Sequence, residues 1–187
     1  MGIERVKFQA RKIMWGAKES LADLGILGGP IEVNIEPEVH EVKDDRLGDE
    51  PLATILKSSK VKIKATFSEI DKAFYKTLLD GFGLKAITPT GTDTTEVIAG
   101  GTGQNGVNLS ANAKMLVLKP MNKTDADKTE DIAFFKAIPK LAGGMKFTGN
   151  EQHNVEVEFT IIPDESMKAD NNKFVIGDWS QAGLANA

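Results

Sequence analysis

The chain has 187 residues, of which 41% are hydrophobic and 27% charged, a composition that supports one folded domain with a sizeable core. It has no cysteine, which excludes disulfides and thiolate metal sites. The formal net charge of −4 disfavours tight DNA binding, because a protein that grips phosphates needs a basic face. No apolar run reaches membrane-spanning length, so we expect no membrane partner.

The N-terminal third is expected to form two strands and a long charged connection. Residues 6–14 have strand character, and apolar and polar residues alternate over residues 31–36 until a proline breaks the phase. Residues 40–52, HEVKDDRLGDEPL, are rich in charge and contain a glycine and a proline. We therefore expect a long loop over about 40–58 and place a short strand at 52–56 within it.

The next segment is expected to be a strand followed by the main helix. Lysines alternate with apolar residues over 60–67, which indicates a half-buried antiparallel strand. Ser68 can serve as the N-cap of a helix, and a later Asp-Gly pair supplies its stop. A helix is therefore predicted over about 68–80, with Phe74 and Leu78 on its apolar face.

Residues 101–106, GTGQNG, have the G-x-G-x-x-G spacing of a dinucleotide-binding turn. Such a turn needs a strand before it and a helix directly after it, because the helix N-terminus holds the pyrophosphate. Residues 95–99 can supply the strand, but residues 107–112 contain two asparagines and a β-branched valine, with no helical stripe. We favour a glycine-rich loop over about 99–112 and keep a nucleotide-binding enzyme as an alternative.

The second half of the chain is expected to be mostly strands. Residues 115–118 are apolar at every position, which predicts burial on both faces, by the chain's own core and by a neighbour. The acidic connection 120–131 resembles the start of a calcium loop at Asp125 and Asp127, but its sixth and twelfth positions lack the residues that an EF-hand requires. A solvated acidic loop is therefore favoured. The expected strands here are 114–119, 132–138, 155–161 and 174–176.

No set of residues points to catalysis. The two histidines, His40 and His153, are far apart in sequence, and the chain contains neither a G-x-S-x-G nor an H-E-x-x-H motif. We expect no catalytic residue, cofactor or metal, and hence no enzyme. The fold class that follows is mainly β: an antiparallel β-sandwich or barrel with one flanking α-helix and long loops. Such a profile is typical of an assembly protein whose function lies in its interfaces.

Several segments, in order, resemble the major tail tube proteins of bacteriophages. Residues 15–25, WGAKESLADLG, followed by residues 28–33, GGPIEV, resemble the N-terminal region of that family, where a glycine-rich turn feeds the first long strand. Residues 41–51 resemble its long loop between two early strands, and residues 61–79 resemble its strand-then-helix step. Near the end, the segments FTIIPD and FVIGD resemble its closing pattern. The order and spacing of these segments carry the resemblance.

The resemblance implies one tail-tube-like domain over residues 1–187, six copies of which form a ring. Rings stack into a hollow tube in the virion tail, through which DNA passes during ejection without specific binding. The partners are then further copies and other tail proteins: a tape measure, a baseplate or tip, a terminator, and a sheath where one is present. Synthesis is expected in the cytoplasm of a host bacterium. The implied segments are an N-terminal arm over about 1–25, an inter-ring loop over about 40–58 and a C-terminal arm over about 163–187.

Two sets of residues are expected to face the bore or other subunits. The glutamates of the alternating stretches are expected to line the bore as an acidic surface that repels phosphates; they are Glu32, Glu36, Glu156 and Glu158. Stacking between rings is expected to use the charged loop and its neighbours. The expected contact residues there are Asp44, Asp45, Arg46, Asp49, Glu50, Lys57 and Lys60.

Three other functions stay open at this point. A tail terminator, neck protein or secretion-system tube protein would share the fold. A nucleotide-binding enzyme would use the glycine-rich turn. A β-sandwich ligand-binding module would need exposed aromatic side chains, and the chain has only two tryptophans and one tyrosine.

Overall fold

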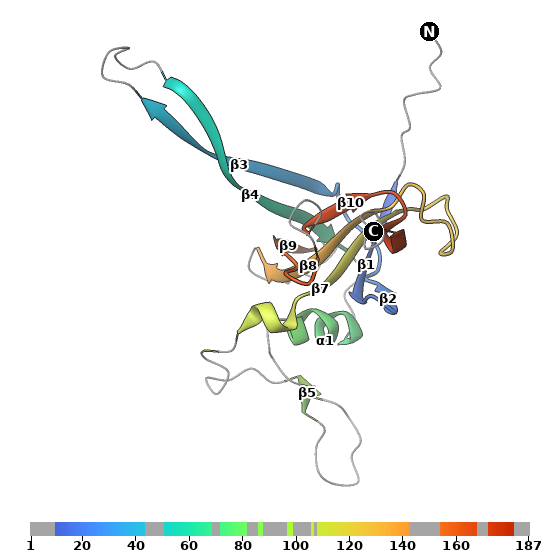
Figure 1. Cartoon of the computed structure of the whole chain (residues 1–187). Helices are drawn as coiled ribbons and strands as arrows, with labels where there is room; N and C mark the ends of the chain where they lie inside the picture. Colours follow the sequence, from blue (N-terminus) through green and yellow to red (C-terminus); the bar gives the residue numbers. More distant parts are fainter. Residues whose placement is uncertain are drawn as a thin grey trace, which may run out of the picture.

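Most of the described residues build one curled antiparallel β-sheet, and the one α-helix among them lies beside it (Figure 1). The computed structural model describes residues 10–43, 51–68, 72–81, 86–87, 97–98, 106, 108–142, 154–167 and 172–181. The predicted fold class, mainly β with one flanking helix, is confirmed. Within these residues, no helix has the length and apolar character needed to cross a membrane.

The main sheet has eight strands, seven of which lie in the order β2-β1-β7-β8-β9-β4-β3, and the eighth, β10, pairs with β8. All of these pairings are antiparallel. The strands are β1 (Arg11–Ala17), β2 (Ser20–Asp23), β3 (Glu32–Lys43), β4 (Pro51–Phe67), β7 (Lys114–Pro120), β8 (Ile132–Leu141), β9 (Val155–Ile162) and β10 (Phe174–Ile176). A separate small pair joins β5 (Ala86–Ile87) to β6 (Val97–Ile98), and the helix is α1 (Lys72–Gly81).

The two ends of the sheet approach each other across the segment between β2 and β3. Leu24 donates its backbone N–H to the carbonyl of Ile13 on β1, at 2.9 Å. Three residues later, Leu27 bridges Phe67 at the end of β4. One short segment thus bonds to both β1 and β4. The sheet is therefore a curled, nearly closed barrel, not a sandwich of two sheets.

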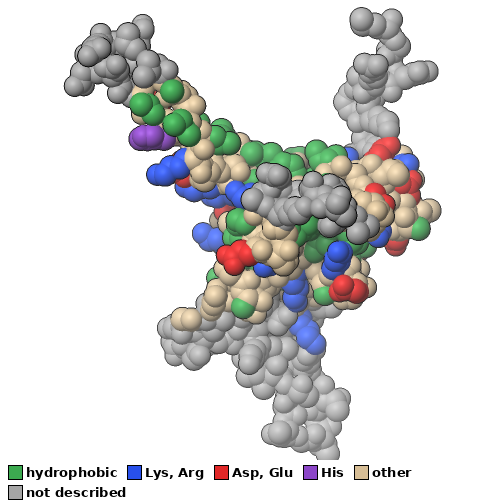
Figure 2. All heavy atoms as spheres, viewed as in Figure 1, with side chains coloured by type: hydrophobic (Ala, Val, Ile, Leu, Met, Phe, Trp, Pro, Cys, Tyr) green, Lys and Arg blue, Asp and Glu red, His purple; other side chains and the backbone are tan. Residues whose placement is uncertain are grey.

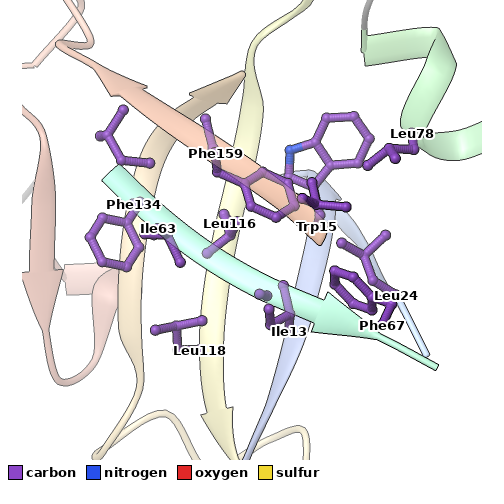
Figure 3. Packing of buried hydrophobic residues seen from close by; sticks show 14 of the residues in the cluster. Ile13, Trp15, Leu24, Ile63, Phe67, Leu78, Leu116, Leu118, Phe134 and Phe159 are labelled. Carbon is purple, nitrogen blue, oxygen red and sulfur yellow. The ribbon is translucent and has the colours of Figure 1, made fainter. Parts of the chain in front are cut away.

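The core fills the inside of this curl (Figure 3). Alternation explains its composition: on β9 and on residues 61–67 of β4, every second residue is apolar and buried, so one face of each strand points inward there. Phe74 and Leu78 of α1 close one end, as predicted for the helix face. The largest core side chains are Ile13, Trp15, Ile63, Phe67, Leu116, Leu118, Phe134 and Phe159.

β7 is buried on both of its faces, as its unbroken apolar sequence predicts. Leu116 and Leu118 point into the main core, whereas Met115 and Val117 join a second cluster on the outside of the sheet. Trp179 covers that second cluster, together with partly buried residues such as Val175. The outer face of β7 is therefore covered by residues of this chain's own C-terminal segment, whereas we had expected a neighbour to cover it.

A buried ion pair lies beside the second cluster. The Nζ of Lys119 lies 3.3 Å from Asp131, and both side chains are 2% exposed. Lys119 also donates to the carbonyl of Asp127 at 2.6 Å, and the indole Nε1 of Trp179 donates to Asp131 at 3.1 Å. Each buried charge therefore has more than one partner, which offsets its desolvation.

The hairpin β3–β4 differs most from the sequence expectation. We expected a loop over about 40–58, but β3 continues to Lys43 and β4 begins at Pro51, while residues 44–50 lie outside the described part. The expected break at Pro37 does not occur either, since Pro37 pairs with Ser59 in the ladder. Proline is tolerated there because β3 is an edge strand: the side of β3 that faces away from β4 has no strand, within the described residues, that would accept an N–H hydrogen bond.

Both expected arms are largely part of the body. Residues 10–25 contribute β1 and β2, and residues 172–181 contribute β10 and a short 3-10 helix, Trp179–Gln181. β10 pairs with β8 just beyond the stretch of β8 that pairs with β9, so both strands lie on the same side of β8. The expected helix over 68–80 is observed from Lys72, and residues 69–71 lie outside the described part.

Replacing Lys119 by methionine should destabilise the fold by about 3–5 kcal/mol, because Asp131 stays buried without its cation. Urea unfolding of the Lys119→Met variant measures this loss. Pairing Lys119→Met with Asp131→Asn should recover much of the stability, since the amide keeps an acceptor for Trp179 without a charge. Lys123→Met removes a more exposed ion pair, to Asp127, and serves as the control, with a much smaller expected change in the free energy of unfolding. Equal losses in Lys119→Met and the control would contradict the assignment.

Candidate assembly interface

The hairpin β3–β4 projects from the body of the molecule (Figure 1). β9 pairs with β4 as far as Val61↔Ile161, and beyond that point β3 and β4 pair only with each other. On its other side, β3 has no strand partner within the described residues. A row of backbone N–H and C=O groups is thus left open along β3, which is a ready template for another strand.

One face of the hairpin is apolar and exposed. Val33 pairs with buried Ile63, and Ile35 pairs with buried Val61, so both lie on the face that continues the core. Pro37 and Ser59 form the next pair on this face toward the tip, and Val39 and Leu56 form the pair after it. These side chains are 39% (Val33), 51% (Ile35), 49% (Val39) and 64% (Leu56) exposed, and Figure 2 shows hydrophobic side chains along the hairpin. The strip is interrupted on β4 by Ser59, and an exposed apolar strip of this kind is typical of an interaction surface.

The opposite face of the same strands carries charges whose sign alternates from strand to strand. In one row across the sheet, Lys140 pairs with Glu158, Glu158 with Lys64, and Lys64 with Glu32. Unlike charges on adjacent strands attract, and each such pair contributes roughly 0.2–1 kcal/mol. The columns are Lys136 and Lys140 on β8, Glu156 and Glu158 on β9, Lys60, Lys62 and Lys64 on β4, and Glu32, Glu36 and Glu38 on β3.

The four glutamates expected to line a bore, Glu32, Glu36, Glu156 and Glu158, share this face. Five lysines and five glutamates make up its columns, so the face is charge-balanced where a uniformly acidic surface was expected. Two ion pairs form within it at 3.7 Å, Lys62 to Glu158 and Lys60 to Glu38. That this face lines a bore stays a prediction.

The residues expected at an inter-ring contact are only partly described. Lys57 and Lys60 lie exposed on the projecting part of β4, and Lys60 pairs with Glu38 of the same hairpin. The other five lie outside the described residues: Asp44, Asp45, Arg46, Asp49 and Glu50. Their contact with the lysines of another copy therefore stays a prediction.

A second open edge lies on the last residues of β8. β7 pairs with β8 only as far as Lys114↔Ala137, so beyond Ala137 the side of β8 that faces away from β9 has no strand partner within the described residues, although the 3-10 helix Leu109–Asn112 contacts β8. Pro139 lies in this stretch; it costs the ladder with β9 no bond, and it leaves this edge one N–H donor short. Lys140 gives this edge a basic column on the charged face, opposite in sign to the acidic column of β3.

The glycine-rich turn lacks the helix that nucleotide binding needs. Gly106 has a left-handed φ of 86°, and a four-residue 3-10 helix, Leu109–Asn112, leads directly into β7. A phosphate site requires an α-helix whose N-terminal amides converge on the anion. Residues 99–105 lie outside the described part, and His153 does too, whereas His40 is exposed on β3.

In the loop that resembles the start of a calcium site, lysine side chains bond to the aspartates. Asp125 accepts from Lys12 at 3.0 Å, and Asp127 accepts from Lys123 at 2.8 Å and from Thr129 at 2.6 Å. The hydrogen bond from Lys123, followed by those from Thr129, holds the pKa of Asp127 well below its ordinary value. No cluster of three or more potential metal ligands occurs in the described part of the chain.

An open cavity of about 690 Å³ lies between the start of β1 and the segment that leads into β3. Ile26 and Met121, both exposed, contribute to its lining. Arg11 also lines it, but its guanidinium already donates to the carbonyls of Leu118 and Glu130, at 3.0 and 2.9 Å. The described residues that line the cavity are mostly apolar, and the charged ones among them are Arg11, Lys12 and Asp23.

Sequence reasoning identified the alternating strands and their glutamates but missed the alternation of sign between strands. The lysine row of residues 60–64 and the two glutamate rows are visible in the sequence. Which rows become neighbours depends on strand order, and no local pattern encodes that order. The second open edge on β8 was missed for the same reason.

No protein-family model and no curated protein matches this chain. Among solved structures, the chain is similar to a chain of the sheath–tube complex of an extracellular contractile injection system, PVC, in the extended state. The identity is 9% over 86% of this chain and 93% of that chain, with a TM-score of 0.48. It is also similar to a chain of the anti-feeding prophage cap, described as a tube-terminating cap, with 10% identity over 86% of this chain and 94% of that one and a TM-score of 0.45. Likenesses of this size assign neither a family nor a function.

Replacing Ile35 and Leu56 by serine should weaken self-association while leaving the monomer folded, because both side chains are exposed in the single chain. The free energy of unfolding should change by no more than about 0.5 kcal/mol per site. Analytical ultracentrifugation measures the association. Ile176→Ser is a matched control, since Ile176 is 69% exposed but lies on β10, away from the strip. An equal effect of both changes would contradict the role of the strip.

The depressed pKa of Asp127 makes its loop sensitive to acid. The folded state binds the proton less tightly than the unfolded chain, so Asp127 adds stability above its ordinary pKa of 3.8. That contribution should disappear as the pH falls below 3.8 toward the folded-state pKa. Carbon-detected NMR of the Asp127 carboxyl group tests this, and it should titrate below its ordinary pKa of 3.8. Titration near 3.8 would show that the bonds to Lys123 and Thr129 do not persist in solution.

Proposed function

We propose that this chain is the structural subunit of a tail tube, which acts by self-assembly and carries out no chemical reaction. The observation that carries the proposal is the open edge of β3 on a hairpin whose apolar face is exposed. Within the described residues, a single copy pairs no strand with the outer edge of β3 and leaves the apolar side chains of the strip exposed. Pairing with another copy would satisfy both at once, because strand addition supplies main-chain hydrogen bonds and apolar burial together.

The partner edge fits best on β8 of the next copy. The row Lys140–Glu158–Lys64–Glu32 ends with a glutamate on β3, so a strand that continues the alternation must present a lysine. The open part of β8 presents Lys140 in that column. Joining β3 of one copy to β8 of the next extends four strands, β8-β9-β4-β3, into a larger sheet whose charges keep alternating.

Such a contact joins two different edges and is therefore heterologous. Repeating it with a rotation that closes yields a ring, and we propose six copies per ring, as the resemblance to tail tube proteins implies. The charged face of the joined sheets would line the bore. DNA can pass such a lining without sticking, because every lysine column is flanked by glutamates that offset its attraction for phosphate.

We propose that rings stack into a tube through the outer parts of the hairpins, with Lys57 on β4 and the charged residues 44–50 of the sequence as contacts. Single exposed ion pairs contribute only about 0–1 kcal/mol each, so stacking would depend on their repetition around the ring. The proposed partners are other copies of this chain and the remaining tail proteins: tape measure, baseplate or tip, terminator, and a sheath where one is present. The proposed location is the virion tail.

Negative-stain electron microscopy of the purified chain tests the proposal, and long hollow cylinders are expected. Val33→Pro should abolish them while the monomer still folds. Pro37 has no N–H, so its pair with Ser59 is one in which the β3 residue directs its backbone groups away from β4. This orientation recurs at every second residue of β3, so the N–H groups of Ile35 and Val33 also face the open edge. Val33→Thr keeps the N–H and the β-branched shape and is the matched control. Isolated single rings would indicate a terminator, and a monomer under all conditions would overturn the proposal.

A further inference from the structure

The base of the projecting hairpin is held by a residue far away in sequence. The Nζ of Lys173 donates to the backbone carbonyl of Ser59, and to its hydroxyl at 3.1 Å. Ser59 lies on β4 two residues beyond Val61, the last residue of β4 that pairs with β9 toward the tip. The contact is therefore made at the point where the hairpin leaves the support of the sheet.

Lys173 can hold the hairpin because its own backbone is fixed to the body. Its carbonyl accepts from the N–H of Phe135 at 3.1 Å, and the next three residues form β10, which pairs with β8. Phe174 packs against Phe134 of the core, with ring centroids 5.9 Å apart. The Lys173 side chain therefore extends from a fixed backbone to Ser59, and this contact is separate from the hydrogen bonds between β4 and β9.

The other end of the same segment is fixed as firmly. Gly177, with a left-handed φ of 114°, turns the chain after β10 and donates its N–H to the carbonyl of Asp131 at 2.8 Å. Trp179 then inserts into the second apolar cluster and bonds the carboxylate of Asp131. Lys128 lies over the ring of Trp179, 4.0 Å from its centroid. Residues 172–181 are therefore tied to the body at both ends, with Lys173 directed at the hairpin.

We propose that residues 172–181 form a brace that sets the direction of the β3–β4 hairpin relative to the body, and that Lys173 is its positioning residue. A two-stranded ribbon without further support bends and twists readily. With Lys173 in place, the ribbon starts from a fixed point on β4. The inference rests on the proposed function only in its consequence: a hairpin held in one direction loses less conformational freedom when it meets another copy.

Pulsed electron paramagnetic resonance tests the brace on the single chain. The chain has no native cysteine, so spin labels at Thr54→Cys on the hairpin and Asn122→Cys on the body report one distance. In Lys173→Met the distribution of that distance should broaden about twofold, since the hairpin loses its fixed point. Lys173→Arg keeps donors to the carbonyl of Ser59 and should restore a narrow distribution. The unfolding midpoint of Lys173→Met should fall by no more than about 2–4 °C, which separates loss of the brace from loss of the fold.

Lys18→Met is the control, because Lys18 is exposed in the turn between β1 and β2. An unchanged width in Lys173→Met, or equal broadening in the control, would overturn the brace. The same variants examined by electron microscopy separate the two proposals. If the wild-type chain never assembles but Lys173→Met broadens the distance distribution, the tube proposal is overturned and the brace stands. If the wild-type chain assembles but Lys173→Met leaves the distribution unchanged, the brace is overturned and the tube proposal stands.

Discussion

The open backbone edge of β3 is the constraint on which the functional account depends. Strand pairing satisfies most of the backbone N–H and C=O groups in the middle of the sheet, but in the described residues the outer side of β3 lacks that pairing along its whole length. Soluble proteins usually protect such an edge by shortening, bulging or covering it. The β3–β4 ladder does contain Pro37 and two register irregularities, between Glu38 and Val39 and between Val42 and Lys43. The edge is nevertheless long, it projects from the body, and it is accompanied by exposed apolar side chains that include Ile35 and Leu56. The combination favours a strand that is completed by another copy.

The rest of the chain supplies a rigid base for that edge. The sheet curls until Leu24 and Leu27 join its two ends, and the core inside it is continuous from Ile13 to Phe159. The C-terminal segment then adds a second, outer cluster, where the buried pair of Lys119 and Asp131 receives the indole of Trp179. The polar anchors are specific, because a charge buried there without its partner would be costly. The core and the buried ion pair thus lie in the body of the molecule, and the projecting hairpin stays exposed.

Local patterns predicted the elements well and their ends poorly. Strict alternation located the strands around residues 31–36, 60–67 and 155–161, since one buried face per strand leaves a period of two. The hairpin was read as a loop over about 40–58 because its outer part is charged and exposed on both faces, so no buried face imposes a pattern there. Trp179 and Lys173 gave no signal at all, because their partners, Asp131 and Ser59, are distant in sequence. The alternating columns of the charged face depend on strand order in the same way.

Hydrogen exchange of individual β3 amides, compared between the single chain and the assembled form, tests the central claim most directly. In the single chain, the N–H groups of Val33 and Ile35 should exchange rapidly, while those of Asn34 and Glu36 should be protected by β4. Assembly should slow Val33 and Ile35 to the rate of their neighbours, because a second strand then accepts their hydrogen bonds. If the assembled form left Val33 and Ile35 exchanging as fast as in the single chain, the β3 edge would not be the joining surface.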